Sequence, residues 1–244
     1  MIYGTATDKG LIRSNNEDSF RVYSNNGDFP IAFILADGMG GHKKGELASS
    51  IAVDYSLERI SNEIHSLESV DAVSEFLKDI FEKSNVKVYL GSLEDENNKG
   101  MGTTLTIAVI FEDTLIIGHM GDCRAYLLRK NSFMRITVDH TLVQELVDTN
   151  KISPEQAIKH PKRHVLTRAL GVPEYMTAEI YTISLEKNDK LILSSDGLHS
   201  FVSESIIKSV IKKEKNPADA AQLLVNYANS SGGEDNVTVI AAYL

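Results

Sequence analysis

The sequence predicts an α+β fold: a four-layer α-β-β-α sandwich in which two central antiparallel sheets are flanked by helix pairs. Three observations lead to this prediction. Strand-like runs occur in groups, helical periodicity occurs in adjacent pairs of segments, and some strand-like runs are separated by only two residues. Links that short join antiparallel strands, because parallel strands need a crossover of about a dozen residues or more. The grouping also argues against a doubly wound parallel sheet, in which strands and helices alternate.

The expected strands are rich in Val, Ile, Thr and Tyr and are bounded by Gly, Asp and Asn. In chain order they cover residues 2–7, 31–36, 103–111, 114–120, 123–128, 177–185, 190–194 and 236–244. Glu112-Asp113 separates the third strand from the fourth, and Gly121-Asp122 separates the fourth from the fifth. We therefore expect one antiparallel pairing at each of these two links.

Helical periodicity defines two long pairs of segments with a short helical insert between them. In chain order these segments cover residues 45–64, 70–90, 142–149, 154–159, 203–213 and 217–230. Ser203 suits an N-cap, Pro217 suits a first helical turn, and SPEQ at residues 153–156 fits a capping box. The two long pairs are enough to cover the outer faces of two sheets.

Composition indicates a single globular domain. The chain has 244 residues, 42% of them hydrophobic, which is enough apolar material for a sizeable core. It has no internal repeat and no Pro- or Ser-rich linker, so we expect one domain over residues 1–244. The formal net charge of −9 makes nucleic acid and anionic membranes poor partners.

The features that bear on location favour the cytoplasm. The N-terminal residues lack the basic region and apolar run of a secretory signal, and no stretch reaches the ~18 apolar residues of a membrane span. Cys123 is the single cysteine, which excludes an internal disulfide and a Cys-rich zinc site and fits a reducing compartment. We therefore expect a cytoplasmic protein without direct membrane insertion.

Acidic residues recur where the expected strands end, beside Gly or Asn. The segments ILADG, GHMGD, LSSDG and GGEDN contain Asp37, Asp122, Asp196 and Asp235, and an acidic pair, Glu17-Asp18, follows the first strand. A single Asp at a strand end is usually a turn former that binds its own backbone. Five such sites in one antiparallel domain indicate instead that the carboxylates converge.

Converging carboxylates cannot all stay ionised in a partly dry site unless cations neutralise them. Ligand sets made only of oxygen favour Mg²⁺ or Mn²⁺, and no His or Cys cluster has the spacing of zinc ligands. Two such ions about 3.5–4 Å apart lower the pKa of a shared water, which can then attack phosphorus in line. The pattern therefore predicts metal-assisted hydrolysis of a phosphate ester.

The segment DGMGGH at residues 37–42 follows one of these strands. Its three glycines let backbone atoms approach a ligand closely, and a Gly carbonyl could bind metal; the alternative is a flexible turn before the first long helix. The segment lacks the GK[ST] of a P-loop and the spacing of a dinucleotide-binding fingerprint. The chain also has no H-E-x-x-H and no G-x-S-x-G.

Two further residues have both a structural and a functional interpretation. Arg13 lies four and five residues before Glu17 and Asp18. It is either a partner in a surface ion pair or a planar fork that binds phosphate oxygens. His42 lies five residues after Asp37, and is either a surface histidine or the general acid for the leaving oxygen.

At these residues the sequence resembles the metal-dependent protein phosphatases, the PPM or type 2C family, and most of all their compact bacterial serine/threonine members. The matching segments follow the family order over nearly the whole chain. They are RSNNEDSF (13–20), LADGMGGHKKGELAS (35–49), MGTT (101–104), HMGDCRAY (119–126), TVDH (137–140), HPKRHVLTRALG (160–171), SSDGL (194–198) and GGEDNVTVI (232–240).

The resemblance implies a set of metal ligands. Asp37 bridges two metals, and the carbonyl of Gly38 completes the protein ligands of the second. Asp196 and Asp235 hold the first metal. Asp122 matches the ligand of a third, weaker metal, which Asp196 shares.

The resemblance also implies roles around the metals. Glu17 and Asp18 match acids that orient metal-bound water. Arg13 matches the phosphate-binding arginine, and His42 matches the proposed general acid. Residues 141–175 resemble the bacterial flap, a mobile segment beside the active site. The helix–sheet–sheet–helix fold of the family agrees with the sandwich predicted from the strand and helix pattern.

Two positions depart from the family pattern. The GDSR of many relatives is GDCR here, and for Cys123 a small buried residue on a strand is favoured over a reactive thiol. Some relatives carry an acid four residues after the SDG aspartate, where this chain has Ser200. The second protein ligand of the third metal is therefore in question, whereas the two-metal core is complete.

The expected function is metal-dependent hydrolysis of phosphoserine and phosphothreonine in proteins by a metal-bridging hydroxide. The cofactors are Mn²⁺ or Mg²⁺, two ions per chain, and Asp122 is the candidate ligand if a third ion binds. The alternatives are a catalytically inactive phosphatase-like binding module, which loss of core ligands would favour, and a phosphatase for small phosphate esters. The expected partners are phosphorylated proteins and a cognate Ser/Thr protein kinase, and the expected state is a monomer.

Overall fold

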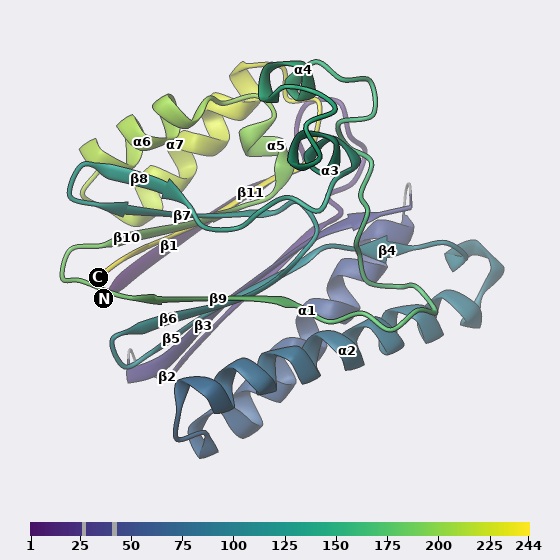
Figure 1. Cartoon of the computed structure of the whole chain (residues 1–244), viewed down its shortest axis with the longest axis horizontal. Helices are drawn as coiled ribbons and strands as arrows, with labels where there is room; N and C mark the ends of the chain where they lie inside the picture. Colours follow the sequence, from purple (N-terminus) through teal and green to yellow (C-terminus); the bar gives the residue numbers. More distant parts are fainter. Residues whose placement is uncertain (26–27, 41–42) are drawn as a thin grey trace.

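Two antiparallel sheets lie face to face, and helices cover the outer side of each (Figure 1). The structure is a computed structural model that describes residues 1–25, 28–40 and 43–244. The five-stranded sheet runs in the order β1 (Ile2–Asp8), β11 (Val237–Tyr243), β10 (Lys190–Ser194), β7 (Arg124–Arg129) and β8 (Ser132–Arg135). The six-stranded sheet runs in the order β2 (Asp18–Asn25), β3 (Asp28–Met39), β5 (Leu105–Phe111), β6 (Thr114–Met120) and β9 (Glu179–Ser184), with β4 (Gly102–Thr103) paired to β3.

Two pairs of long helices form the outer layers, which confirms the predicted sandwich. The pair α1 (Lys43–Glu63) and α2 (Val70–Glu94) packs on the six-stranded sheet, and the pair α6 (Glu204–Lys213) and α7 (Pro217–Ser230) packs on the five-stranded sheet (Figure 1). The shorter helices are α3 (Leu142–Asp148), α4 (Pro154–Ile158), α5 (Asp196–His199) and the 3₁₀ turns η1 (Ile64–Ser66) and η2 (Glu96–Asn98). Within the residues that the structure describes, no helix is both long and apolar enough to cross a membrane.

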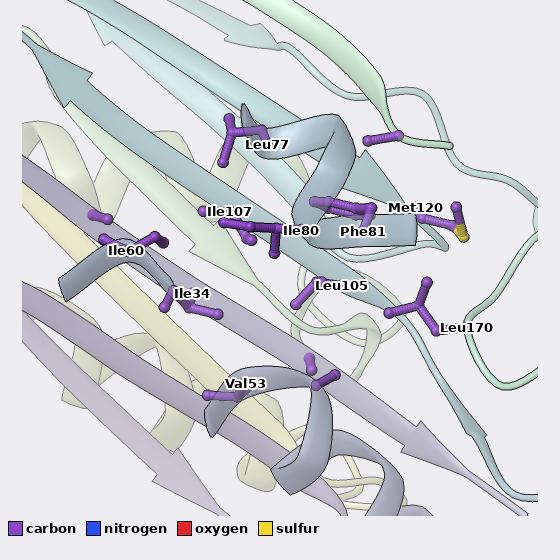
Figure 2. Packing of buried hydrophobic residues seen from close by; sticks show 14 of the residues in the cluster. Ile34, Val53, Ile60, Leu77, Ile80, Phe81, Leu105, Ile107, Met120 and Leu170 are labelled. Atoms are coloured by element: carbon purple, nitrogen blue, oxygen red, sulfur yellow. The ribbon is translucent and has the colours of Figure 1, made fainter. Parts of the chain in front are cut away.

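Strand alternation divides the buried side chains into layers. In β3, positions 32, 34 and 36 pack against the helices, whereas positions 31, 33 and 35 pack between the sheets. A strand covered on both faces needs an unbroken apolar run, which IAFILA provides. Figure 2 shows the helix side, where Ile60 of α1 and Ile80 and Phe81 of α2 lie over Ile34 and Ile107. Burial of each large apolar side chain stabilises the fold by about 1.5–3 kcal/mol.

The link at Gly121-Asp122 contradicts the predicted hairpin. The strand β6 pairs with β5 and β9 in one sheet, whereas β7 pairs with β10 and β8 in the other. Residues 121–123 therefore cross between the sheets. Three extended residues span about 10 Å, which is also the spacing of stacked sheets, so a link of hairpin length can serve as a crossing. The Glu112-Asp113 link does join paired antiparallel strands, as predicted.

Two strands were absent from the prediction. Most residues of β2 are only half-buried, and β8 has only four residues, so neither shows a long apolar run. The strand β2 is held in place by its ladder to β3. The strand β3 also continues past its predicted end, through Asp37 to Met39, because Gly38 and Met39 pair with β4.

The three helix starts that were predicted from capping residues are correct. The capping box of α4 is complete: Gln156 N–H donates to Ser153 Oγ (3.3 Å), and Ser153 N–H donates to Gln156 Oε1 (2.8 Å). Ser203 is the N-cap residue of α6, although its side chain makes no capping hydrogen bond. Pro217 is the first residue of α7.

Candidate active site

Strand ends from both sheets bring the predicted acids to one edge of the sandwich. The ladder between β2 and β3 places Asp18 directly opposite Asp37. Asp196 begins α5 two residues after β10, Asp235 lies two residues before β11, and Asp122 lies in the crossing between β6 and β7. Burial raises the pKa of Asp37, and the charges of the other four carboxylates raise it further. These five residues, predicted from separate motifs, therefore occupy one site.

The side chains of Asp37 and Asp196 lie close enough for each to affect the pKa of the other. Burial raises the pKa of both carboxyl groups. For Asp196, the hydrogen bond from His164 and the nearby His199 outweigh burial, so its pKa lies below the ordinary value. Without bound cations, a proton at this pair therefore resides on Asp37 rather than on Asp196. The pKa of Asp122 is also raised, by burial and by the charge of Asp196.

Only one of the two carboxylate oxygens of Asp18 is hydrogen-bonded among the described residues. Its Oδ2 accepts hydrogen bonds from Ser195 Oγ and Thr238 Oγ1, both at 2.7 Å. Its Oδ1 is buried and has no hydrogen-bond partner among the described residues. Burial raises the pKa of Asp18 to about 7 against these two hydrogen bonds, and the charges of Asp196 and Asp235 contribute. An unpartnered buried oxygen costs about 1–3 kcal/mol, which water or a cation at the site would relieve.

Backbone contacts fix the position of Asp37 and of the Gly38 carbonyl. Asp37 N–H donates to Thr104 Oγ1 (2.8 Å), and Gly38 N–H donates to the Glu17 carbonyl (3.1 Å). A Cβ on Gly38 would lie 2.0 Å from the Gly45 carbonyl oxygen, so only glycine lets the start of α1 pack this closely. The packing sets the Gly38 backbone directly beside the acids.

Asn236 ties Glu17 to the first loop of the chain. Glu17 N–H donates to Asn236 Oδ1 (2.8 Å), and Asn236 Nδ2 donates to the carbonyls of Lys9 and Asn15 (2.9 Å each). Asn236 follows Asp235 directly, so one amide side chain holds the segments that carry Asp235 and Glu17 together. This residue was not predicted as part of the site.

Arg13 lies at the rim of the acid site. Its Nη2 is 3.0 Å from each carboxylate oxygen of Asp235, and its Nε–H donates to the Glu234 carbonyl (3.2 Å). The ion pair considered from the sequence, with Glu17 or Asp18, is therefore replaced by one with Asp235. The guanidinium is half-exposed, so it can reach an incoming anion.

A cleft of about 800 Å³ opens beside Asp122 and Asp196. Residues of α3, α4 and α5 line it, together with Arg163 and His164 from the loop that follows α4. His164 Nδ1 lies 3.2 Å from Asp196 Oδ2, so this loop touches the acid site directly. His164 was not predicted as a site residue, although it belongs to the HPKRHVLTRALG motif. Ser200 also lines the cleft, and its side chain is exposed.

Cys123 is buried in the crossing between β6 and β7. Its Sγ lies 3.2 Å from Thr104 Oγ1. Burial and the charges of Asp37 and Asp122 raise its pKa well above the ordinary value, so the thiol stays protonated. The geometry favours the small buried residue over the reactive thiol.

Residues 137–140, which we call the brace, contact Gly121 of the same crossing and Arg124, the first residue of β7. Arg124 binds Asp139 through Nε–Oδ1 (2.9 Å) and Nη2–Oδ2 (2.6 Å), and His140 Nδ1 accepts from Gly121 N–H (3.0 Å). The TVDH motif signals this segment in the sequence, but its partners could not be read from spacing because they lie 15 and 19 residues away along the chain.

The donor set fits hard divalent cations. The site offers buried carboxylate oxygens that repel one another, and one of these oxygens has no partner. Over the described ranges, no three or more His, Cys, Asp and Glu side chains are arranged to hold one ion by themselves. Mg²⁺ is usually bound by one or two carboxylates and keeps several waters, so pairs of these acids are a sufficient protein share. His42, expected as the general acid, lies outside the described residues.

Comparisons with known proteins agree over most of the chain. The family model described as Protein phosphatase 2C matches residues 12–239. The serine/threonine phosphatase stp of Listeria welshimeri is 37% identical over 234 residues, which are 96% of this chain and 92% of the relative. The protein phosphatase PhpP of Streptococcus pneumoniae is 37% identical over 235 residues, which are 96% of this chain and 93% of the relative.

The fold comparison extends this similarity to solved structures. The serine/threonine phosphatase Stp1 from Staphylococcus aureus has a TM-score of 0.93 and 34% identity, with 99% of this chain and 94% of that chain covered. The catalytic domain of the serine threonine protein phosphatase PstP, solved in complex with two manganese ions, has a TM-score of 0.84 and 33% identity, with 100% and 98% covered.

Proposed function

Because this chain belongs to the protein phosphatase 2C family, we propose that it removes phosphate from phosphoserine and phosphothreonine in proteins, with divalent cations as cofactors. The observation that carries the proposal is the convergence of Asp37, Asp196 and Asp235 where strands of both sheets end. Relatives named as serine/threonine phosphatases favour a protein substrate over a small phosphate ester. The inactive binding module is disfavoured, because each acid that the family resemblance requires is present.

Asp37, Asp196, Asp235 and the Gly38 carbonyl would hold two cations, and Asp122 would contribute to a third site. We propose Mn²⁺ or Mg²⁺, because the donors are all oxygen and because the PstP structure contains two manganese ions. When bound, the cations would acidify water and withdraw charge from the phosphoryl oxygens. Before they bind, the proton that the raised pKa keeps on Asp37 must leave.

The remaining residues orient the reactants. Asp18 Oδ1 is positioned to accept a hydrogen bond from water. Glu17, the preceding residue, is proposed to share this role of orienting water. We propose that the Arg13 guanidinium gives up one of its contacts to Asp235 and binds phosphate oxygens instead. His42 is proposed as the general acid on sequence grounds alone.

The proposal also covers the setting of the reaction. We propose a single domain over residues 1–244 in which residues 141–175 act as a flap beside the cleft, supported by the positions of α3, α4 and His164 along its wall. A cognate Ser/Thr protein kinase would supply the phosphorylated substrates, and the chain would act as a cytoplasmic monomer.

The substitution Asp37→Asn tests the proposed function. With Mn²⁺ and a phosphothreonine peptide, we expect kcat/KM to fall by more than the roughly 10- to 100-fold that loss of an indirect metal contact costs. Excess chelator should give the same loss in the wild-type protein. Asp113→Asn, in the exposed β5–β6 link, is the matched control and should keep wild-type turnover.

Two outcomes would contradict this proposal. If Asp37→Asn or the chelated enzyme keeps wild-type turnover, the metal-dependent reaction is wrong. If kcat/KM for p-nitrophenyl phosphate exceeds that for every phosphoserine and phosphothreonine peptide, the small-ester alternative is favoured.

A further inference from the structure

The brace contacts the chain on both sides of Asp122. Downstream of Asp122, in β7, Ala125 N–H donates to Thr137 Oγ1 (3.0 Å), and the Arg124 guanidinium donates to both carboxylate oxygens of Asp139. Upstream, Gly121 is bound by His140. Among the residues that the structure describes, none of the brace is hydrogen-bonded to the Asp122 side chain, so the direction of that side chain depends on how its neighbours are held.

The contact between His140 and Gly121 is reciprocal. His140 N–H donates to the Gly121 carbonyl (2.8 Å), and Gly121 N–H donates to His140 Nδ1 (3.0 Å). Because Nδ1 accepts a hydrogen bond, the proton of the neutral ring lies on Nε2. Nε2 is 3.1 Å from Glu179 Oε1, which accepts that proton as a hydrogen bond. Both nitrogens of the ring are therefore used.

Because Gly121 is a glycine, its hydrogen bond to His140 has a strong effect on the orientation of the following residue, Asp122. Its φ of +111° lies in the region that favours glycine, and a Cβ there would lie 2.4 Å from Thr104 Cγ2. A glycine has the freest backbone of any residue, so its peptide orientation must be fixed from outside. The His140 ring supplies that restraint within one residue of Asp122.

His140 also reaches the returning arm of the 141–175 segment. Thr167 N–H donates to the His140 carbonyl (2.9 Å). Arg168 Nη1 lies 3.0 Å from Glu179 Oε1, the oxygen that also faces the His140 ring. The arm and the crossing are thus anchored on one residue.

We propose that His140 is a positioning residue: its Nδ1 fixes the Gly121 amide and thereby aims the Asp122 carboxylate at the acid site. Through its carbonyl and Nε2–H it couples this orientation to the arm at residues 167–168. The inference rests on the proposed function only for its activity readout.

Two amide substitutions of His140 distinguish the role of Nδ1 from the role of Nε2. His140→Asn places an acceptor near the position of Nδ1 and loses the contact to Glu179. His140→Gln reaches the Nε2 position and loses the acceptor for Gly121. His119→Asn is the matched control, because the ring centroids of His119 and His140 are 5.0 Å apart and His119 contacts Thr106 and the Val138 carbonyl of the brace but not Gly121.

Hydrogen exchange of the full chain without metal is the first measurement. We expect the Gly121 amide to exchange at least about tenfold faster in His140→Gln than in the wild-type protein, and to stay protected in His140→Asn and His119→Asn. The second measurement is turnover of p-nitrophenyl phosphate against Mn²⁺ concentration. His140→Gln should need more Mn²⁺ for half-maximal activity and lose about 10- to 100-fold in kcat/KM. His140→Asn should stay close to the wild-type protein in both quantities.

Several results would overturn the inference. One such result is equal protection of the Gly121 amide, or an equal Mn²⁺ requirement, in His140→Asn and His140→Gln. Another is a His119→Asn variant that shows the same fast Gly121 exchange and raised Mn²⁺ requirement as His140→Gln. If both His140 variants unfold, ¹⁵N spectra of the wild-type ring decide, because a proton on Nδ1 contradicts the proposed acceptor. If the wild-type protein hydrolyses no phosphate ester, the proposed function fails, while the exchange comparison still decides the role of His140.

Discussion

Asp18 is one of the site acids whose protonation state depends on folding. Burial raises its pKa from 3.8 to about 7 against the hydrogen bonds from Thr238 and Ser195. The folded chain therefore keeps a proton on Asp18 in a pH range where the unfolded chain has already lost it. Stability contributed by the neutral form is present at low pH, falls as the pH rises from about 4 to 7, and is constant above that.

Asp18→Asn should remove this dependence when no metal is bound. We expect the free energy of unfolding of the variant, relative to wild type, to increase by on the order of 1 kcal/mol per pH unit between pH 5 and 7 and to level off above. Urea unfolding in chelator at each pH measures it. Asp113→Asn is the exposed control measured alongside, and a flat difference for Asp18→Asn would contradict the pKa shift.

The acids themselves could be predicted, whereas the residues that hold them could not. An Asp beside Gly or Asn at the end of an apolar run, such as Asp37 or Asp196, is visible in a linear sequence because the signal is local. Asn236 and His140 act through contacts to Lys9 and Gly121 that depend on how distant segments meet. Both residues are polar types that serve many structural roles, so the sequence offers no local sign of their partners.

At the scale of elements, local periodicity predicted the helices better than the strands. All the long helices were found within a few residues, because apolar spacing and caps such as Pro217 are local signals. The edge strand β2 was missed, because half-buried polar residues leave no alternating pattern. The crossing at Gly121 was misassigned, because link length alone does not reveal whether two strands share a sheet.

The helix α2 offers a test of how the helix layer stabilises the sheet. Leu77 of α2 is fully buried against the six-stranded sheet, whereas Leu90 on the same helix is 53% exposed. Leu77→Ala should lower the free energy of unfolding by about 2–5 kcal/mol through lost burial and a cavity. Leu90→Ala should change it by less than about 0.5 kcal/mol. Denaturant unfolding measures both, and equal losses would contradict the layered core.

At the scale of the whole molecule, cation binding should stabilise the fold. Free Mn²⁺ at about 100 times its Kd adds roughly 3 kcal/mol, provided that the unfolded chain does not bind it. For a chain of this length that corresponds to a rise in Tm of roughly 5–10 °C.

Calorimetry with and without Mn²⁺ measures this rise, and chelator should reverse it. Asp37→Asn, which lacks the proposed bridging carboxylate, should show a much smaller rise than Asp113→Asn. An unchanged Tm for the wild-type protein over the same Mn²⁺ range would argue against a preformed cation site.

The pairing of β1 with β11 places the two ends of the described chain side by side. Ile2 is opposite Tyr243, and Asp8 is opposite Val237 at the other end of the ladder, near the loop that carries Asp235 (Figure 1). Six residue steps along a strand amount to roughly 20 Å. A tag, tether or surface support attached at either end would therefore sit on the side of the sandwich remote from the acids, and immobilised molecules would present their reactive edge to solution.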